Sequence, residues 1–150
     1  MRSKFTKQAD FQQEITGDTF RLPIRVYYQD TDAGGVVYHG THLNFMERAR
    51  YEWLRELGFD DPTLREVHKV LFMVRSLEIE YFKPAVLDDL VHVTVQVVNI
   101  GRSSIAVHQQ IRRDDTLLVR ATIGVVCVGT ESLKPVRVPL PLREKIENLL

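Results

Sequence analysis

Two carboxylates, a pair of glycines and a histidine lie close together in one short segment of the chain. Asp30 and Asp32 follow an apolar stretch and are predicted to enter a loop, because Asp is a poor strand residue. Gly34 and Gly35 allow the backbone conformations that a tight loop needs, including φ above zero. A helix is predicted to begin between His39 and Thr41, so its unpaired N–H groups could face the acids. A carboxylate can attack a substrate or activate water, and the helix N–H groups can hold an oxyanion.

Asp32 is the candidate catalytic acid, as a nucleophile or as a general base. The residues alone leave an alternative open, because an Asp before a glycine turn often closes an Asx turn. Asp30 would point to the same face as Asp32 if the strand continued through both residues. We expect the chain to turn at Thr31 instead, which gives Asp30 either a structural role or a role in supporting the catalytic residues. His39 could be a buried core histidine, a surface residue or an active-site group.

Glu47 lies on the predicted helix and is a backup acid. A simpler interpretation is a surface ion pair with Arg50, which is three residues further along the helix. His39, His42 and Glu47 lack a further well-spaced ligand, so we expect no metal site and no cofactor.

The spacing of apolar residues predicts the elements that must position these groups. Alternation over residues 22–28 indicates a half-buried strand. A helix is indicated by apolar residues at three- and four-residue steps, with Gly58 as its stop: Leu43, Met46, Ala49, Trp53 and Leu57. A short helical turn is predicted over residues 61–67. From Leu77 to Cys127 the chain alternates again in four strands, with hairpin turns at Gly101-Arg102 and Asp114-Asp115. One long helix with one sheet indicates an α+β architecture.

Composition bounds the class of protein. A chain of 150 residues fits one domain with a sizeable core, and 20 basic against 20 acidic residues leave no net charge to recruit nucleic acid. Cys127 is the single cysteine and lies in an apolar alternation, which indicates an inert core residue in a reducing compartment. No apolar run approaches the roughly 20 residues of a membrane span, and no apolar signal segment follows the basic N-terminal residues. We therefore expect a cytoplasmic protein.

The same segments carry a family resemblance. The signature of the 4-hydroxybenzoyl-CoA thioesterase family of hotdog-fold enzymes is similar to the run Thr31-Asp32-Ala33-Gly34-Gly35-Val36-Val37-Tyr38-His39. The chain most resembles the YbgC-type acyl-CoA thioesterases of the bacterial Tol-Pal gene cluster, through that run and through Glu47-Arg48-Ala49-Arg50, Glu80-Tyr81-Phe82-Lys83-Pro84-Ala85 and Leu87-Asp88-Asp89. The resemblance implies a hotdog fold, in which a curved five-stranded antiparallel sheet wraps a long central helix. We expect a hotdog domain over residues 20–142, a polar N-terminal extension over 1–19 and a short helical tail over 143–150.

The resemblance also implies an activity, the hydrolysis of acyl-CoA to a free acid and coenzyme A. Asp32 falls on the family's catalytic carboxylate, and His39 on the residue whose backbone N–H polarises the thioester carbonyl. The family usually has Tyr or Phe where this chain has His42. Candidate substrate-binding residues are Tyr28, Tyr38, His42, Arg102, Ser103 and Ser104. Core packing would explain the two tyrosines equally well, whereas Arg102 and the basic stretch 134–137 could hold the phosphates of coenzyme A.

Hotdog subunits usually pair edge to edge, which implies a homodimer or homotetramer with sites at the subunit boundary. Acyl-CoA is the expected substrate, and an acyl carrier protein is a further candidate partner. Two alternatives stay open. A hotdog acyl dehydratase or hydratase would use His39 and Glu47 as base and acid and would not need Asp32. A non-catalytic module would bind an acyl carrier protein as a scaffold in envelope or lipid assemblies.

Overall fold

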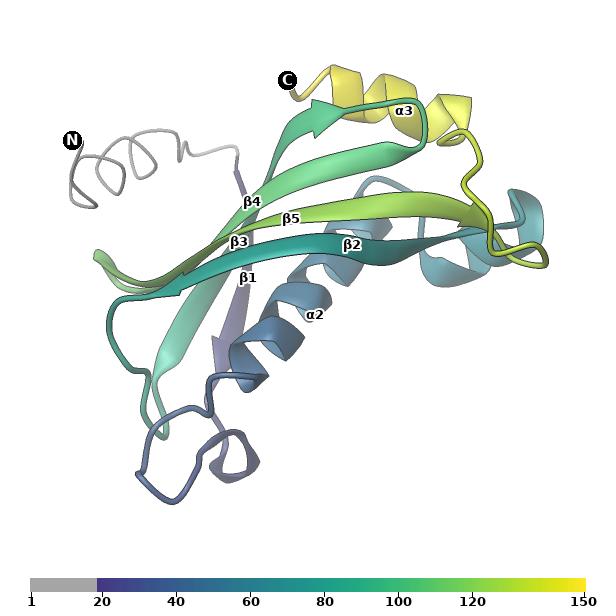
Figure 1. Ribbon diagram of the computed structural model, residues 1–150. Coiled ribbons are helices and arrows are strands. Elements are labelled where there is room, and N and C mark those ends of the chain that lie inside the picture. The colour runs from purple at the N-terminus through teal and green to yellow at the C-terminus, as the bar shows by residue number, and fades with distance from the viewer. Residues whose placement is uncertain (1–18) are drawn as a thin grey trace.

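The computed structural model describes residues 19–150 (Figure 1). Its elements follow in the order β1 (Phe20–Arg25), η1 (Tyr28–Asp30), α2 (Thr41–Glu56), η2 (Thr63–Val67), β2 (Val70–Tyr81), β3 (Leu90–Ile100), β4 (Ser104–Arg113), β5 (Thr116–Gly129) and α3 (Leu140–Glu147). The predicted order of one strand, one long helix and then four strands is confirmed. Residues 1–18, which form nearly all of the predicted N-terminal extension, lie outside the described residues.

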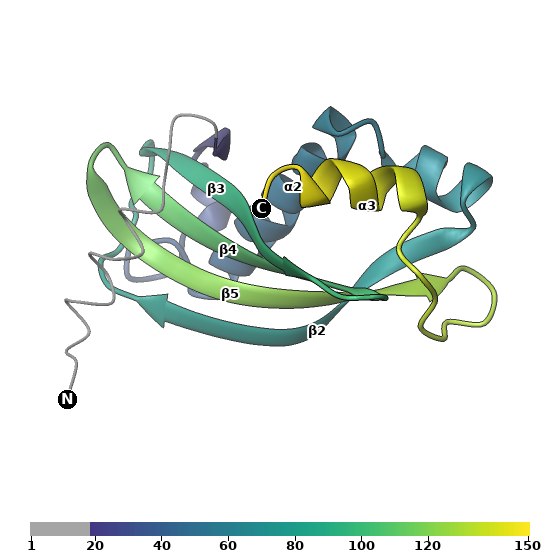
Figure 2. The same ribbon diagram turned by 90° about the horizontal axis from the view of Figure 1, so that it is seen from above.

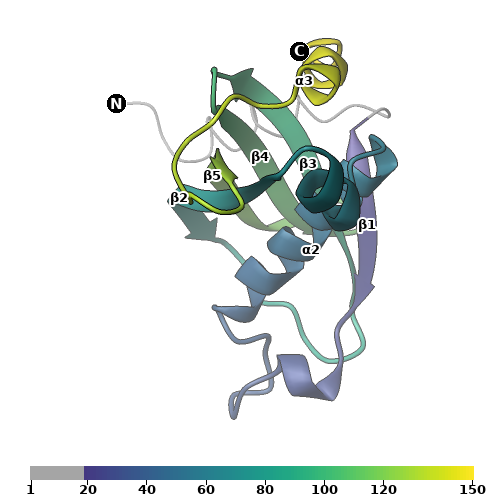
Figure 3. The ribbon, with the colours of Figure 1, turned by 90° about the vertical axis from the view of Figure 1, so that its right-hand side faces the viewer.

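The five strands form one antiparallel sheet in the order β1-β3-β4-β5-β2. The strand that follows the long helix therefore crosses to the far edge and pairs with β5, along Val70–Tyr81. Figures 2 and 3 show the sheet curving around α2. The predicted α+β architecture with a five-stranded antiparallel sheet is confirmed.

The core lies between α2 and the concave face of the sheet. The buried face of α2 presents Phe45, Met46, Ala49 and Trp53. The facing strands present buried residues at alternate positions, including Val91, Val93, Val95, Val97, Ile105, Val107 and Ile111. Each large apolar side chain that is fully buried here contributes about 1.5–3 kcal/mol to the free energy of folding, so this packing fixes where α2 begins and ends over the sheet.

One fully buried polar side chain, Gln109 of β4, joins the helix to the sheet. Its Nε2 donates to the carbonyl oxygens of Met46 (3.1 Å) and Thr94 (3.2 Å). Its Oε1 accepts a hydrogen bond from the guanidinium of Arg50 (2.9 Å). Because a buried polar group without partners is unfavourable, these bonds allow Gln109 to occupy a core position.

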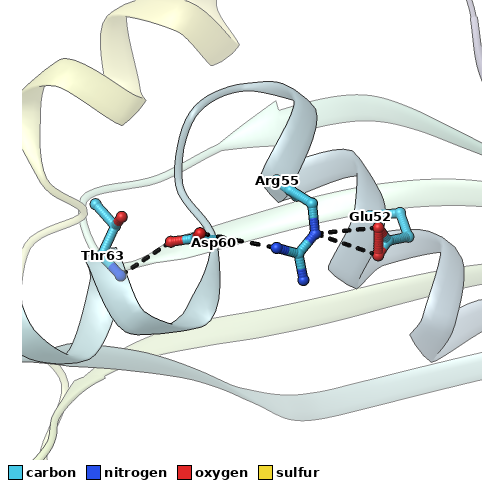
Figure 4. Close-up of polar contacts among 4 residues, drawn as sticks. All are labelled: Glu52, Arg55, Asp60 and Thr63. Atoms are coloured by element: carbon cyan, nitrogen blue, oxygen red, sulfur yellow. Dashed lines mark hydrogen bonds and ion pairs between the residues drawn. The ribbon is translucent and has the colours of Figure 1, made fainter.

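The C-terminal end of α2 is closed by a chain of polar contacts (Figure 4). Gly58 has φ +92°, the left-handed conformation expected after a helix. Arg55 contacts Glu52 (3.1 Å) and Asp60 (3.7 Å), and Asp60 accepts a hydrogen bond from the Thr63 amide (3.0 Å). The short turn predicted over residues 61–67 is present as η2, so the chain is held where it leaves α2 for β2.

The C-terminal helix α3 lies near the hairpin between β3 and β4 (Figure 1). Its buried side chains Leu142 and Ile146 join the core. The carbonyl oxygens of Gly101 and Arg102 in the hairpin accept hydrogen bonds from Arg143. Among residues 19–150, no helix is long and apolar enough to cross a bilayer.

Candidate active site

The loop between β1 and α2 carries the predicted catalytic residues and is folded by its own backbone. The predicted strand over 22–28 ends at Arg25, because residues 28–30 form the single 3-10 turn η1. The Asp32 amide donates to the Val36 carbonyl (2.9 Å), and the Gly35 amide donates back to Asp32 (3.0 Å). Gly35 has φ +79°, which a residue with a side chain would adopt with strain. A hydrogen bond from the Val37 amide to Ala85 (2.9 Å) ties this loop to the segment before β3.

The two acids of the loop serve different turns. Asp30 accepts a hydrogen bond from the Tyr27 amide (2.8 Å) and so caps η1, as expected for a structural role. Asp32 Oδ1 accepts one from the Gly34 amide (2.8 Å), which is the Asx turn that the sequence left open. A Cβ on Gly34 would lie 3.2 Å from that same oxygen, so glycine suits this close approach. Asp32 is exposed, and within residues 19–150 its other oxygen, Oδ2, accepts no hydrogen bond.

The chain reaches α2 with two unpaired N–H groups. The helix begins at Thr41, with Gly40 as its N-cap. Within the described part of the chain, the amides of His39 and Gly40 donate to no acceptor. Unpaired amides at a helix N-terminus favour negative charge, because the helix dipole points its positive end towards them. These two groups can therefore stabilise an oxyanion.

His42 is a buried residue of the first turn of α2. Its side chain is 3% exposed and packs between the rings of Phe45 and Tyr81. Burial lowers the pKa of His42, although hydrogen bonding to backbone carbonyls of His39 and Tyr38 opposes that shift. A neutral, buried ring can form a wall for an apolar ligand.

A groove opens beside these groups, with a volume of about 290 Å³. It is lined by Val37, His39, His42, Tyr81, Phe82, Lys83 and Pro84. The lining is mostly apolar or aromatic, and one cation, Lys83, stands among it. Tyr81 was not singled out by sequence reasoning as a site residue. The sequence did place Tyr81 at the end of an alternating strand. The alternation could not show which strand pairs with this one, and that strand pairing brings Tyr81 to His39.

The other predicted residues fall into two groups. Tyr28, on η1, is 82% exposed, and the ring of Tyr38 lies against that of His39 with centroids 4.2 Å apart. Both belong to the loop end of the molecule. Figure 1 shows the hairpin of residues 101–104 at the opposite end of the sheet, beyond the end of β3. One chain therefore does not bring Arg102, Ser103 and Ser104 to the loop.

Glu47 is exposed on α2. Arg50, the partner expected for it, donates instead to Gln109 Oε1 (2.9 Å), and Glu47 acts on that guanidinium as a nearby negative charge. Gln109 was available because it lies in the core directly beneath this turn of the helix. Among the described residues, no group of three His, Cys, Asp or Glu side chains could hold a metal ion.

Comparisons with known proteins show the family of this chain. The sequence profile described as "Thioesterase superfamily" matches residues 34–120. The chain is 43% identical over 130 residues to "Acyl-CoA thioesterase YbgC" of Haemophilus influenzae, covering 87% of this chain and 96% of that protein. It is also 43% identical over 121 residues to "Acyl-CoA thioester hydrolase YbgC" of Escherichia coli O6:H1, covering 80% of this chain and 90% of that protein.

A solved structure shows the same fold. The 1,4-dihydroxy-2-naphthoyl-CoA thioesterase of Synechocystis matches with a TM-score of 0.79 and 26% identity, covering 87% of this chain and 97% of that one. The five-stranded sheet wrapped on one long helix is thus the fold of thioesterases with solved structures, and the predicted hotdog fold is confirmed. The chain belongs to the thioesterase superfamily.

Proposed function

We propose that this protein is an acyl-CoA thioesterase, which hydrolyses acyl-CoA to a free carboxylic acid and coenzyme A. One observation carries the proposal: the exposed carboxylate of Asp32 lies in the loop that delivers the unpaired N–H groups of His39 and Gly40 to the N-terminus of α2. Two relatives that are 43% identical over most of the length of this chain bear the name of this activity.

The chemistry needs a site for the developing oxyanion and a group that begins the attack. The thioester carbonyl oxygen accepts hydrogen bonds from the His39 amide and, in the transition state, from Gly40. Asp32 Oδ2 then acts in one of two ways. It attacks the carbonyl carbon, the C–S bond breaks to release the thiolate, and water hydrolyses the resulting anhydride. Alternatively it takes a proton from water and the hydroxide attacks the same carbon; the C–S bond then breaks, and the departing thiolate takes up the proton. Both routes yield the acid and coenzyme A.

A second copy of the chain would complete the substrate channel. β2 is an edge strand whose exposed residues include Met73, Val74 and Leu77, an apolar edge that favours pairing. Antiparallel pairing of two β2 strands would lay the start of one strand beside the end of the other. The hairpin end of one copy would then lie on the same side as the loop of its partner. This arrangement supports a dimer, or a tetramer of two dimers.

That pairing also gives Arg102 a role in binding. Near the hairpin, a hollow of about 590 Å³ is lined by residues that include Arg102, Arg137 and Arg143. Arg102 and Arg137 are exposed, whereas Arg143 donates to the hairpin carbonyls. Guanidinium groups bind phosphate in a bidentate manner. We assign Arg102 and Arg137 to the phosphates of coenzyme A, while Ser103 and Ser104 fix the hairpin beside them.

The test is turnover of a panel of acyl-CoA substrates, from short aliphatic to long-chain and aromatic. Asp32→Asn keeps an oxygen that can accept from Gly34, so the variant should fold yet lose about two decades of kcat or more. Glu47→Gln is the matched control and should hydrolyse acyl-CoA like the parent protein. An inactive Glu47→Gln beside an active Asp32→Asn would assign the chemistry to the helix acid. Hydration of enoyl-CoA without thioester hydrolysis would identify a hydratase instead.

A further inference from the structure

The carbonyl oxygen of His39 is the meeting point of two side-chain donors. The Tyr81 hydroxyl donates to it at 2.8 Å, and His42 Nδ1 lies 3.2 Å from it. Tyr81 is the last residue of β2, whereas His42 lies in the first turn of α2. The peptide unit that joins His39 to Gly40 is therefore held from the sheet and from the helix at once.

The protonation of the His42 ring follows from this contact. A carbonyl oxygen can only accept, so Nδ1 must carry the ring proton. Burial disfavours a second proton, which leaves Nε2 as an acceptor. Nε2 is buried, and no donor among the described residues reaches it. A ring with an unsatisfied buried atom is less favourable than a phenylalanine of similar size. A phenylalanine at position 42 would lack the hydrogen bond that Nδ1 makes with the His39 carbonyl.

The peptide held in this way carries one of the two groups that would bind the oxyanion and adjoins the other. The Gly40 N–H belongs to the same peptide plane as the His39 carbonyl, and the His39 N–H is joined to that plane through a single Cα. Rotation of the plane would re-aim the first group and disturb the second. Hydrogen bonds to the carbonyl also polarise the peptide, which makes its N–H a stronger donor.

We infer that Tyr81 is a positioning residue for the oxyanion site, with His42 as the second donor to the same oxygen. Tyr81 acts by holding the His39–Gly40 peptide in the orientation that presents the Gly40 N–H, and the adjoining His39 N–H, to substrate. The inference rests on the proposed thioesterase function, because it assigns those N–H groups to the thioester carbonyl. Tyr81, a side chain of the edge strand 42 positions away from His39 in the sequence, sets the geometry of those N–H groups.

Three variants test the inference: Tyr81→Phe, His42→Phe and the double variant. Each single variant leaves one donor on the carbonyl, so kcat should fall about three- to tenfold with KM nearly unchanged. Loss of both donors frees the peptide, and kcat should then fall by more than about 100-fold, which exceeds the product of the single effects. Tyr51→Phe is the matched control, because Tyr51 is also half-exposed and its hydroxyl makes no hydrogen bond within residues 19–150. It should behave like the parent protein.

A second measurement follows the peptide itself. The ¹⁵N chemical shift of the Gly40 amide reports polarisation of the His39 carbonyl, and it should move in each single variant and furthest in the double variant. A parent protein that hydrolyses no acyl-CoA would refute the proposed function, while the Gly40 shift would still decide whether Tyr81 holds the peptide. An unshifted Gly40 amide, a double variant with the kcat of the parent protein, or a change confined to KM would overturn the inference.

Discussion

Acidification should destabilise this protein through His42. Burial lowers the pKa of the ring below its usual value of 6.5, the charge of His39 adds to that effect, and hydrogen bonds to backbone carbonyls oppose it. In the unfolded chain the ring recovers its ordinary pKa. As the pH falls through 6.5, the unfolded chain therefore binds a proton that the folded protein does not, and the free energy of unfolding decreases. The decrease ends once the pH is below the folded pKa.

The size of the effect follows from proton counting. Where the unfolded and folded states differ by one proton, the free energy of unfolding falls by about 1.4 kcal/mol per pH unit. His42→Phe removes this dependence. At neutral pH it also loses the contact with the His39 carbonyl, worth about 0.5–1.5 kcal/mol, and relieves the unpartnered Nε2, whose burial costs about 1–3 kcal/mol. The variant should therefore be about as stable as the parent protein near pH 7, or more stable by up to about 2.5 kcal/mol.

Urea unfolding followed by circular dichroism between about pH 5 and 7.5 measures the difference. The remaining histidines are present in both proteins, so their contributions cancel when the two curves are subtracted. Carboxylates with lowered pKa, such as Asp60 and Asp89, titrate below this range. His68→Gln is the control, because its half-buried ring is at the other end of α2, beside Phe59. Parallel stability curves for the parent protein and His42→Phe would refute this account of the buried ring.

Three further outcomes are expected. Burial opposes the charge of Asp89, but hydrogen bonds from a backbone amide and from Arg113 (2.8 Å) lower the pKa of its carboxyl group. The ionised carboxylate therefore stabilises the folded protein above pH 3.8, and this stabilisation is lost as the pH falls through the lowered pKa. Asp89→Asn should thus cost about 1–3 kcal/mol at pH 7 and little in strong acid, by urea unfolding at both pH values. Burial raises the pKa of Cys127 to about 11, so a thiol reagent at pH 8 should label unfolded protein but not native protein, and rapid native labelling would contradict this. Leu77→Lys on edge strand β2 should shift the molar mass measured by light scattering towards that of the monomer, whereas Glu66→Lys, exposed on η2, should leave the mass unchanged. An unchanged mass for Leu77→Lys would refute the pairing of two β2 strands.

Much of the fold could be predicted from the chain alone, because apolar spacing reports the local conformation. The three- and four-residue steps from Leu43 to Leu57 predicted α2, and Gly58 marked its end where φ is positive. Alternation predicted the strands, although β1 ends at Arg25 and not at residue 28, and the two hairpin turns fell where they were expected. The turn at Asp32 could also be predicted, since Asp32 and the glycines occupy a tight turn that leads into the helix.

Tertiary structure decided which distant groups meet. Alternation says which face of a strand is apolar but not which strand is its neighbour, so the crossing of β2 to the far edge of the sheet could not be read from the pattern. That crossing places the Tyr81 hydroxyl on the His39 carbonyl. The antiparallel pairing of β3 with β1 sets the hairpin of Arg102 at the opposite end from Asp32. The burial of His42 was likewise undetermined, because a histidine in the first turn of a helix can face solvent or core. Its environment depends on Phe45 and Tyr81, which enclose the ring only after the sheet has closed over the helix.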